Sequence, residues 1–451
     1  MLMTKEPAIQ SRCAEEDIDL VRLLFVTQSG AVRAQTVDTA KLDEAIENGT
    51  TVSQLIQMYN AVGRRNKDGH LTTVGEVRLR PDPDTFRALP YAERTGVMFC
   101  NIQTLDGNPW TIDARSSLRS FSRTLESKGL SPRVSFESEF HLFERNPEGG
   151  DQTIGSPGAY LTESTRETHG TILRAIDALE EQDVVVEKYH PEYAPGKHEI
   201  VTGHQFGLRA ADEHVLVRET VDSVARSDGY RATFLPRPFD NATNGCHLHV
   251  SLWDGETNQF YDSGDGSLSR IGKQFIAGVL EHAPALTALA APTANSYARL
   301  RPQNGAAGYV CWGQENREAL VRVPALKAGD QSGNSLRLEF RGADNAVNPY
   351  LCLLGLLGAG YDGVDRGLEV PEPLSVDPGN LTAEERSKKC VERLPRTLGQ
   401  ALDELESDDV LRDVLGDALF ETYVQVKRSH WRQFAYDSAQ SWEMEHLRSV
   451  Y

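Results

Sequence analysis

The sequence has few cysteines and no long apolar run. Its six cysteines, at positions 13, 100, 246, 311, 352 and 390, form no CxxC pair and no zinc-finger spacing. This scatter argues against a disulfide framework and predicts reduced thiols in a cytoplasmic protein. The longest apolar run, YLCLLGLLGAG at 350–360, is about half of what a membrane crossing needs. The first 20 residues lack the apolar segment of a signal peptide, so we expect no membrane partner.

Positive charge is also scarce. Asp and Glu number 66 against 47 Lys and Arg, which gives a formal net charge of -19. Such a surface argues against a nucleic-acid partner or an anionic membrane. Only 11 of the basic residues are lysines. An acidic, lysine-poor composition suggests adaptation to high salt. A GC-rich genome would also favour arginine over lysine. Folding in molar salt separates these two explanations, because loss of folding there would exclude adaptation to high salt.

The chain is long enough for two to three domains, with 451 residues of which 39% are hydrophobic. Residues 17–38 predict a hairpin around a Ser-Gly turn, and residues 39–49 predict a short helix that ends at Gly49. Prolines at 81, 83 and 90 predict an irregular connection. A helix with Asp113 as its N-cap follows and stops at Gly129. We therefore predict an N-terminal module at 1–112 and a larger domain at 113–451.

Three later segments alternate polar and apolar residues with the period of a β-strand. Their polar positions are Glu137, Glu139 and His141; His247, His249 and Ser251; and Arg337, Glu339 and Arg341. One such strand is usually only the solvated face of a sheet. Three in one domain indicate a site, because gathered charges need a ligand or a metal to compensate them.

The residue types in these strands favour a particular chemistry. Carboxylates with few histidines suit Mg²⁺ or Mn²⁺ better than zinc, and VEKYHPEYAPGKHEI adds Glu187, Glu192 and Glu199 around a Pro-Gly turn. Arginines at 299, 301, 317, 322 and 341 lie in nearby motifs. Arginines beside acidic metal ligands are typical of phosphoryl transfer, although each alone could be a surface residue paired with an acid. The sequence has no Walker-type motif and no GxGxxG followed by a helix.

Five motifs in order, FESEF, PEYAPGKHEI, NGCHLHVSLW, NREALVRVP and LRLEFRGADNAVNPYL, resemble the glutamine synthetase family over nearly the whole chain. The resemblance implies an α+β fold, with an N-terminal β-grasp domain at 1–112. A catalytic domain with a curved antiparallel sheet flanked by helices would occupy 113–451. It also implies a ring-shaped homo-oligomer, a dodecamer of two hexamers, in which the N-terminal module of one subunit completes the next subunit's site.

The resemblance assigns roles residue by residue. It implies one metal site at Glu139, Glu192 and Glu199, and a second at Glu137, His247 and Glu339, with two to three Mg²⁺ or Mn²⁺ ions in all. It also implies contacts to ATP from Glu187, His249 and Ser251. It implies contacts to the transferred phosphate from Arg317 and Arg322, and to a glutamate substrate from Arg299, Arg341 and Gly245, and it counts Arg341 with Arg317 and Arg322 as catalytic. His141 matches no family role and is expected to be structural.

The implied reaction transfers the γ-phosphoryl group of ATP to the side-chain carboxylate of glutamate or a similar acid, and an amine then displaces phosphate. The family's ammonium site carries two acids that are missing here: Asn48 aligns with the first and Gly305 with the second. Lost negative charge and added space favour an organic amine over ammonia, although Glu192, Glu199 or water could act as the base.

Three alternatives stay open. They are a true glutamine synthetase that uses ammonia, a kinase that stops after phosphorylation, and a non-catalytic nucleotide-binding paralogue. The family's Asn-Gly pair before His247 reads Ala242-Thr243 here, with Asn241 or Asn244 as possible substitutes. The acid substrate is therefore predicted only as glutamate-like.

Overall fold

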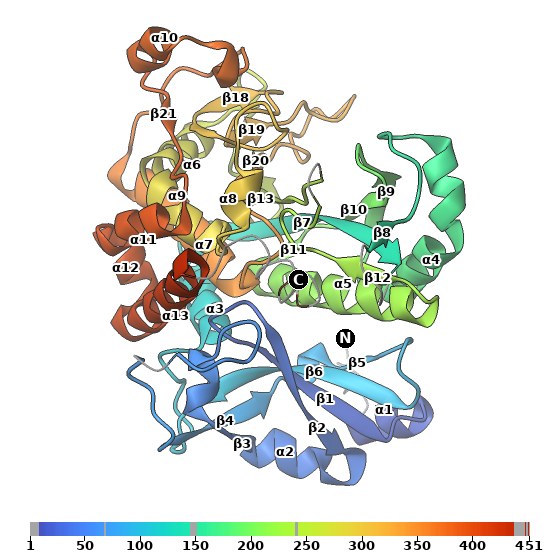
Figure 1. Ribbon diagram of the computed structural model, residues 1–451. Coiled ribbons are helices and arrows are strands. Elements are labelled where there is room, and N and C mark those ends of the chain that lie inside the picture. The colour runs from blue at the N-terminus through green and yellow to red at the C-terminus, as the bar shows by residue number, and fades with distance from the viewer. Residues whose placement is uncertain are drawn as a thin grey trace.

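The computed structural model describes residues 9–66, 69–144, 151–239 and 242–436, together with residues 447 and 450. Its described part contains two large sheets, a smaller one near the N-terminus and a larger one that begins at residue 131, with most helices packed around the larger sheet (Figure 1). The predicted α+β class is confirmed, since long helices and antiparallel strands occur together along the chain.

The smaller sheet has the strand order β2-β1-β6-β4-β3. Its strands are β1 (Leu20–Val26), β2 (Val32–Asp38), β3 (Thr50–Ser53), β4 (Glu76–Pro81), β5 (Arg87–Ala88) and β6 (Thr95–Gln103). β1 and β2 form the predicted hairpin, and β1 lies parallel to β6. The predicted helix after the hairpin is a 3-10 turn, η1 (Thr39–Lys41), followed by α2 (Leu42–Asn48), and Gly49 stops it with a φ of 73°.

The connection predicted as irregular is partly regular, and that prediction was wrong in detail. β4 runs through Pro81, which pairs with Cys100 at the end of the strand, where a missing N–H is tolerated. A 3-10 turn, η3 (Pro83–Thr85), and β5 follow. Two further elements complete this part of the chain, α1 (Ile9–Glu15) and η2 (Gln54–Met58).

The larger sheet has the order β18-β19-β20-β13-β7-β10-β9 and is antiparallel except between β18 and β19. Its strands are β7 (Ser131–Glu144), β9 (Val186–Pro191), β10 (Lys197–Thr202), β13 (Cys246–Asp254), β18 (Trp312–Gln314), β19 (Val321–Val323) and β20 (Leu338–Phe340). β7, with 14 residues, lies at the centre. It also pairs with β8 (Gln152–Thr153), β11 (Gln205–Phe206) and β12 (Arg231–Thr233), while β14 (Thr257–Asn258) extends β13. Two small two-stranded sheets lie outside it. One is the hairpin of β15 (Tyr261–Asp262) and β16 (Ser267–Leu268), and the other pairs β17 (Tyr309–Val310) with β21 (Glu392–Arg393), far apart in the sequence.

Helices surround this sheet. They are α3 (Ala114–Glu126), α4 (Thr162–Glu180), α5 (Gly207–Ser227), α6 (Arg270–Glu281), α7 (Ala283–Ala290), α8 (Ser296–Arg299), α9 (Pro349–Arg366), η4 (Pro378–Asn380), α10 (Ala383–Lys388), α11 (Leu398–Glu406), α12 (Asp409–Leu415) and α13 (Asp417–Tyr436). The Asp113 carboxylate accepts from the N–H of Ser116, so the predicted N-cap of α3 is confirmed. α9 is buried along most of its length and crosses α6 closely: a Cβ on Gly278 would lie 2.2 Å from the carbonyl oxygen of Ala359.

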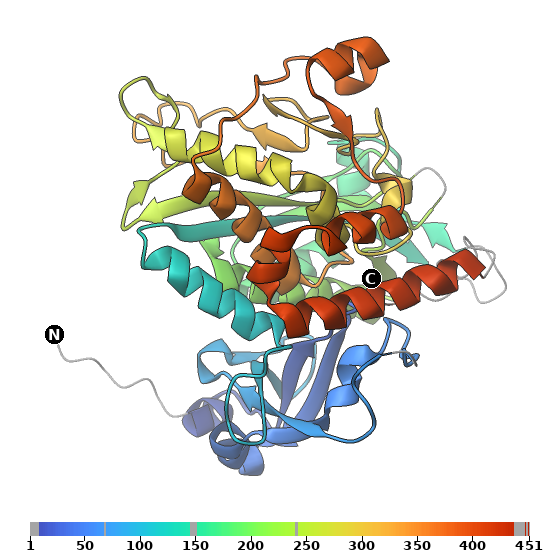
Figure 2. The ribbon, with the colours of Figure 1, turned by 90° about the vertical axis from the view of Figure 1, so that its left-hand side faces the viewer.

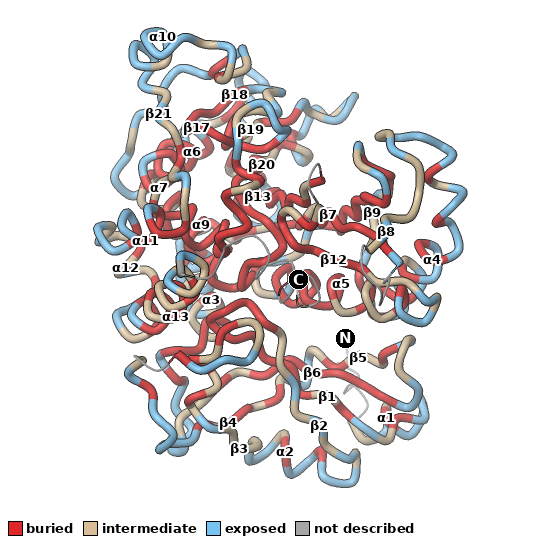
Figure 3. The backbone as a smooth tube through the Cα atoms, in the orientation of Figure 1, coloured by how far each residue is buried: buried red, intermediate tan, exposed pale blue. Residues whose placement is uncertain are grey.

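The smaller sheet is tied to the rest of the chain by the long helix α13, drawn in red in Figure 2. The Lys427 ammonium donates to the Ser29 carbonyl at 3.0 Å, and the Asn60 amide donates to Gln433 at 3.1 Å. One cluster of buried apolar residues extends from the smaller sheet through the helices into the larger sheet (Figure 3), whereas the edge strands β2 and β3 of the smaller sheet have no buried residue. Among the described helices, none combines the length and apolar character that a bilayer crossing needs.

Candidate active site

The register of the larger sheet brings the predicted charged residues together across five neighbouring strands. Cross-strand partners are Glu199 of β10 and Glu139 of β7, Glu137 of β7 and His247 of β13, His249 of β13 and Glu339 of β20, and Arg322 of β19 and Glu339. Like charges directly opposite one another destabilise a sheet. The facing Glu139 and Glu199 therefore indicate that this surface holds a cation.

A cavity of about 800 Å³ opens over this stripe. Of the residues predicted from the sequence, it is lined by Glu137, Glu139, Glu192, Glu199, Gly245, His247, His249, Arg299, Gly305, Arg317, Arg322 and Arg341. Glu339 is buried, with 1% of its surface exposed, and contacts two of the lining arginines. Glu187 and Ser251 do not line the cavity: Glu187 is exposed on β9, and the Ser251 hydroxyl accepts from the Trp253 indole N–H at 2.8 Å.

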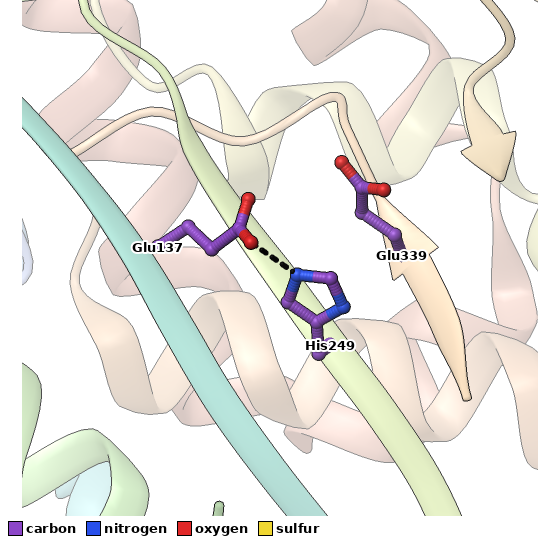
Figure 4. Close-up of side chains that lie close together, drawn as sticks. All are labelled: Glu137, His249 and Glu339. Atoms are coloured by element: carbon purple, nitrogen blue, oxygen red, sulfur yellow. Dashed lines mark ion pairs between the residues drawn. The ribbon is translucent and has the colours of Figure 1, made fainter. Parts of the chain in front are cut away.

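One group of ligating side chains lies on the arginine side of the cavity, and we call Glu137, His247, His249 and Glu339 the arginine-side set. His249 Nε2 lies 2.8 Å from Glu137 Oε1, and His247 Nδ1 lies 3.2 Å from Glu137 Oε2. Figure 4 shows Glu137, His249 and Glu339 converging, with ligand atoms that all lie within 4.8 Å of one another. Both histidines thus reach the carboxylate that the sequence had paired with His247 alone.

The carboxylates of the arginine-side set are already neutralised by neighbouring groups. Arg322 and Arg341 both contact Glu339. Burial alone would raise the pKa of Glu339, but Arg341 and His249 hold it at about 2. Burial likewise opposes ionisation of Glu137, and its two histidines lower its pKa well below the usual range. Both carboxylates are therefore ionised at neutral pH and ready to accept a metal.

The second group lies around the β9–β10 turn, and we call Glu139, Glu192, Glu199 and His190 the lysine-side set. His190 Nε2 lies 3.1 Å from Glu192 Oε1 and 3.6 Å from Glu199 Oε1. Lys197 Nζ lies 2.8 Å from Glu139 Oε2 and 3.7 Å from Glu192 Oε2. Ligand atoms of His190, Glu192 and Glu199 all lie within 4.8 Å of one another.

This second set has more carboxylates than positively charged groups. Burial, together with the neighbouring carboxylates Glu137, Glu139 and Glu192, raises the pKa of Glu199 to about 9. Glu139 behaves oppositely, because Lys197 and His247 outweigh its burial and lower its pKa to about 2. Carboxylate oxygens, with one imidazole in the lysine-side set and two in the arginine-side set, are donors that Mg²⁺ and Mn²⁺ accept. Both sets therefore fit a divalent ion.

The floor of the cavity is rigid. Arg299 is 1% exposed, and its guanidinium donates to the carbonyls of Gly342 and Ala343 at 2.9 and 2.8 Å. A Cβ on Gly245 would lie 3.1 Å from His247 Nε2 and 3.4 Å from a Glu139 oxygen, so no side chain fits there without displacement. These two residues form a fixed surface beside both carboxylate sets.

Of the residues just before His247, one supports the fold and another lines the cavity. Asn244 is fully buried: its amide donates to the carbonyls of Thr233 and Leu235, and its oxygen lies 2.7 Å from His141 Nδ1. These contacts hold Asn244 away from the cavity, which Thr243 lines instead. Asn241 lies outside the described residues. His141 is fully buried as a structural residue, and burial lowers its pKa to about 3.

The cavity is open around Gly305. Gly305 has a φ of +64°, and a Cβ built on it would meet nothing within 4 Å. Its N–H donates to Glu318 Oε1 at 3.2 Å, so a carboxylate that the sequence did not single out lies beside it. Asn48, at the end of α2, is exposed and does not line the cavity of its own chain.

Several residues of the site were missed by sequence reasoning. Lys197 precedes Glu199 by two positions on one strand, so the period-two rule could have placed both on one face. His190 precedes Glu192 in the same motif. Tyr160 stacks on the His190 ring with centroids 4.7 Å apart, and nothing in its sequence neighbourhood indicates this.

Comparisons with known proteins identify the family and the fold. A model of the glutamine synthetase catalytic domain matches residues 111–447, and a model of the glutamine synthetase N-terminal domain matches residues 8–110. The glutamine synthetase of Thermotoga maritima is 32% identical over 443 residues, covering 96% of each chain. That of Mycolicibacterium smegmatis is 34% identical over 434 residues, covering 93% of this chain and 94% of its own.

Solved structures give the same result. A structure described as a GmaS/ADP complex superposes with a TM-score of 0.84 at 26% identity, covering 98% of this chain and 99% of that one. A crystal structure described as a novel glutamine synthase homologue has a TM-score of 0.84 at 30% identity and covers 100% of both chains. The fold and site define an ATP-dependent ligase that forms C–N bonds. The chain belongs to the glutamine synthetase family.

Proposed function

We propose that this ligase joins the side-chain carboxylate of glutamate, or of a similar acid, to an organic amine through an acyl phosphate. The observation that carries the choice of acceptor is the open acceptor side of the cavity. Gly305 offers no side chain there, and a Cβ on it would meet nothing within 4 Å. A substituted amine needs this space, whereas ammonium would be held more firmly by a closer carboxylate.

The nucleotide and its ions are assigned by charge. Glu137, His247 and Glu339 would hold the ion near the ATP phosphates, and Glu139, Glu192 and Glu199 would hold one near the acid substrate, within a total of two to three Mg²⁺ or Mn²⁺ ions. Such ions would neutralise phosphate and carboxylate oxygens. A GmaS structure that contains ADP supports nucleotide binding on this fold. We keep Glu187, His249 and Ser251 as proposed ATP contacts.

The chain's own cations would carry the first step. Arg299 and Arg341 orient the acid, whose side-chain oxygen attacks the γ-phosphorus while the bond from that phosphorus to the ADP oxygen breaks. Arg317 and Arg322 line the same cavity and would stabilise the charge that spreads over the transferring phosphoryl oxygens. No covalent bond to the protein is required.

In the second step the amine nitrogen attacks the acyl carbon, the C–N bond forms and the C–O bond to phosphate breaks. The amine must also lose a proton. Glu318, beside Gly305, adds negative charge at the acceptor side, because its carboxylate lines the cavity and accepts from the Gly305 N–H. It would attract the protonated amine, and Glu192 or Glu199 lies across the cavity as a candidate base.

The test is acceptor-dependent phosphate release with ATP, Mg²⁺ or Mn²⁺, glutamate and a panel of ammonia, mono-amines, polyamines and ethanolamine. We expect an organic amine to have the highest kcat/KM. Ammonia as the best acceptor would favour a true glutamine synthetase, the reading that the names of the curated relatives support. Phosphate release that does not depend on the acceptor would favour a kinase-like reaction. No phosphate release at all would favour a non-catalytic paralogue, although the presence of all six proposed metal ligands argues against that alternative.

We also propose a ring-shaped homo-oligomer, a dodecamer of two hexamers. Asn48 is exposed on the smaller sheet's helix and lies outside its own chain's cavity, so any role for it requires a neighbouring subunit. Size measurement under assay conditions tests this, and a fully active monomer would contradict it.

A further inference from the structure

The two central strands of the larger sheet, β7 and β13, stop pairing regularly beside the cavity. Their last regular partners are Ser138 and Cys246. The next pair, Glu139 and Gly245, would exchange two backbone hydrogen bonds in a regular antiparallel ladder. Among the described residues only one of these bonds forms, from the Glu139 N–H to the Gly245 carbonyl at 3.2 Å. The Gly245 N–H donates to the Glu139 carboxylate instead, so the Glu139 carbonyl lacks its strand partner.

Asn345, which follows β20 in the sequence, supplies the missing donor. This residue is fully buried, and its side-chain amide donates to the Glu139 carbonyl at 3.0 Å and to the Gly245 carbonyl at 2.8 Å. Both partners are acceptors only, so the amide nitrogen must face them. The amide oxygen is buried and has no hydrogen-bond partner in the described part of the chain. Because an unsatisfied buried acceptor destabilises a fold, Asn345 is not explained by stability alone.

The segment that carries Asn345 also contacts the floor of the cavity. The Ala343 carbonyl accepts from the Cys246 N–H at 3.0 Å, next to the point where the two strands separate. The Gly342 and Ala343 carbonyls both accept from the Arg299 guanidinium. One short stretch of backbone thus connects the buried arginine to the end of the regular ladder.

Without the Asn345 amide, the two strands would pair for one more step. The Gly245 N–H would turn to the Glu139 carbonyl, as in a regular ladder, and would leave the Glu139 carboxylate to Lys197, whose Nζ lies 2.8 Å away. Gly245 has little free space, because a Cβ on it would lie 3.3 Å from Arg299 Nη1. A shift of Gly245 would therefore change the surface on which the acid substrate is proposed to bind.

We infer that Asn345 is a positioning residue for the acid substrate, which keeps β7 and β13 open so that the Gly245 N–H serves the Glu139 carboxylate. The inference rests on the proposed function, which places the acid on Arg299, Arg341 and Gly245. Asn345 does not line the cavity, so it acts through these neighbours and not by contact with substrate. Its loss should weaken the binding of the acid and leave the binding of the nucleotide unchanged.

The first test is a crystal structure of full-length Asn345→Ala without ligands. We expect the Gly245 nitrogen to leave the Glu139 carboxylate and to lie within about 3.2 Å of the Glu139 carbonyl oxygen, the range of a backbone hydrogen bond. A Gly245 nitrogen that stays on the carboxylate would overturn the inference, because the strands would then remain open without the amide.

The second test is the steady-state kinetics of the same variant with ATP, glutamate and the best acceptor amine. The KM for glutamate should rise by about tenfold or more, because two buried hydrogen bonds beside the acid are lost. The KM for ATP should change by less than about twofold, and kcat should change less than the KM for glutamate. Equal rises in the two KM values would show a general loss of structure and would contradict the positioning role.

Asn258 on β14 provides the matched control. It is 3% exposed, and its side-chain amide donates to the Gly333 and Leu336 carbonyls at 2.9 and 2.7 Å. Like Asn345, it serves two carbonyls from a buried position, and it does not line the cavity. Asn258→Ala should lower the midpoint of thermal unfolding as Asn345→Ala does, but leave both KM values within about twofold of the wild type. An equal rise in the KM for glutamate would mean that loss of any buried amide has this effect.

Asn345→Asp keeps the inference testable if the alanine variant fails to fold. It has the shape of asparagine and leaves no cavity, but it keeps at most one of the two hydrogen bonds, so the KM for glutamate should rise by at least about threefold. An unchanged KM in this variant would overturn the inference. The crystal structure requires no turnover. A shifted Gly245 nitrogen in a protein without acceptor-dependent phosphate release would leave the main-chain role of Asn345 standing while the proposed function failed.

Discussion

The arginine-side and lysine-side sets lie on the same sheet but balance their charges differently. In the first, Arg341 and the two histidines hold the pKa of Glu339 at about 2, and the histidines hold that of Glu137 well below its usual range. In the second, burial and neighbouring carboxylates raise the pKa of Glu199 to about 9. The first set is thus complete in charge before any ion binds, whereas the second still needs a cation.

Under the proposed function, this difference would correspond to two chemical tasks. A preformed, ionised set suits the ion that accompanies the nucleotide, because the site must accept ATP repeatedly without rearranging. A set that lacks positive charge suits the place where the acid and the amine would meet, because the charge of the bound substrate can then control when a metal ion binds to the set. The cross-strand register creates both, since each acid on β7 faces a different partner strand.

The largest effect that we expect comes from removing one carboxylate from either set. Glu139→Ala and Glu339→Ala should each lower turnover by about a thousandfold or more, because each leaves cations without their anion and a metal without a ligand. Acceptor-dependent phosphate release measures this, and circular dichroism checks the fold. Activity close to wild type in Glu139→Ala would refute the metal assignment for that set.

A smaller loss should follow from the arginine that joins the arginine-side set to the phosphate. Arg322→Gln should lower kcat about a hundredfold with a smaller change in the KM for ATP. Arg322→Lys should restore little, since a lysine cannot form the planar two-pronged contact. Arg301 is exposed and does not line the cavity, so Arg301→Gln is the control and should change kcat less than about twofold. Equal losses in the two glutamine variants would contradict a specific role for Arg322.

Substitution of Gly305 should have a more moderate effect, and it should change the preference between acceptors more than the overall rate. Gly305→Glu should shift kcat/KM toward ammonium and away from the organic amine by about tenfold, because the added carboxylate fills open space and attracts a small cation. Gly305→Ala carries the same backbone strain at a φ of +64° without the charge, so it separates strain from electrostatics. An unchanged preference in Gly305→Glu would show that residue 305 does not face the acceptor.

The smallest effect concerns Lys427, a buried lysine on α13. Lys427 donates to the Ser29 carbonyl, and burial lowers its pKa to about 7. Between pH 7 and its unfolded value of 10.5 the unfolded chain binds more protons, so the free energy of unfolding should rise with pH. From pH 7 to 9 the wild type should gain about 1–2 kcal/mol relative to Lys427→Met in urea unfolding. Parallel pH profiles for the two proteins would contradict the assignment.

Much of the fold and of the ligand shell could be predicted from the sequence. Period-two alternation placed Glu137, Glu139, His247 and His249 on one face, and the structure puts all four on the cavity wall. The same rule extended to Ser251, which does not line the cavity. Four residues of strand carry a side chain about 13 Å along the sheet, so Ser251 lies away from the carboxylate sets, and its ATP contact stays a proposal.

Contacts between distant strands were harder to predict. β20 has only three residues, and its pairing with β13 and β19, which surrounds Glu339 with His249 and Arg322, depends on tertiary packing. Tyr160 reaches His190 from a loop with no periodic pattern. The division of the chain at residues 112 and 113, and the roles of the individual site residues, stay predictions.

The most direct test is isotopic. Glutamate labelled with ¹⁸O in its side-chain carboxylate would be supplied with ATP, Mg²⁺ and the best acceptor amine, and the released phosphate analysed by mass spectrometry. If the carboxylate oxygen attacks the γ-phosphorus and leaves with it, one ¹⁸O atom should appear in phosphate for each C–N bond formed. Amide product accompanied by unlabelled phosphate would contradict the acyl-phosphate route and the role given to both carboxylate sets.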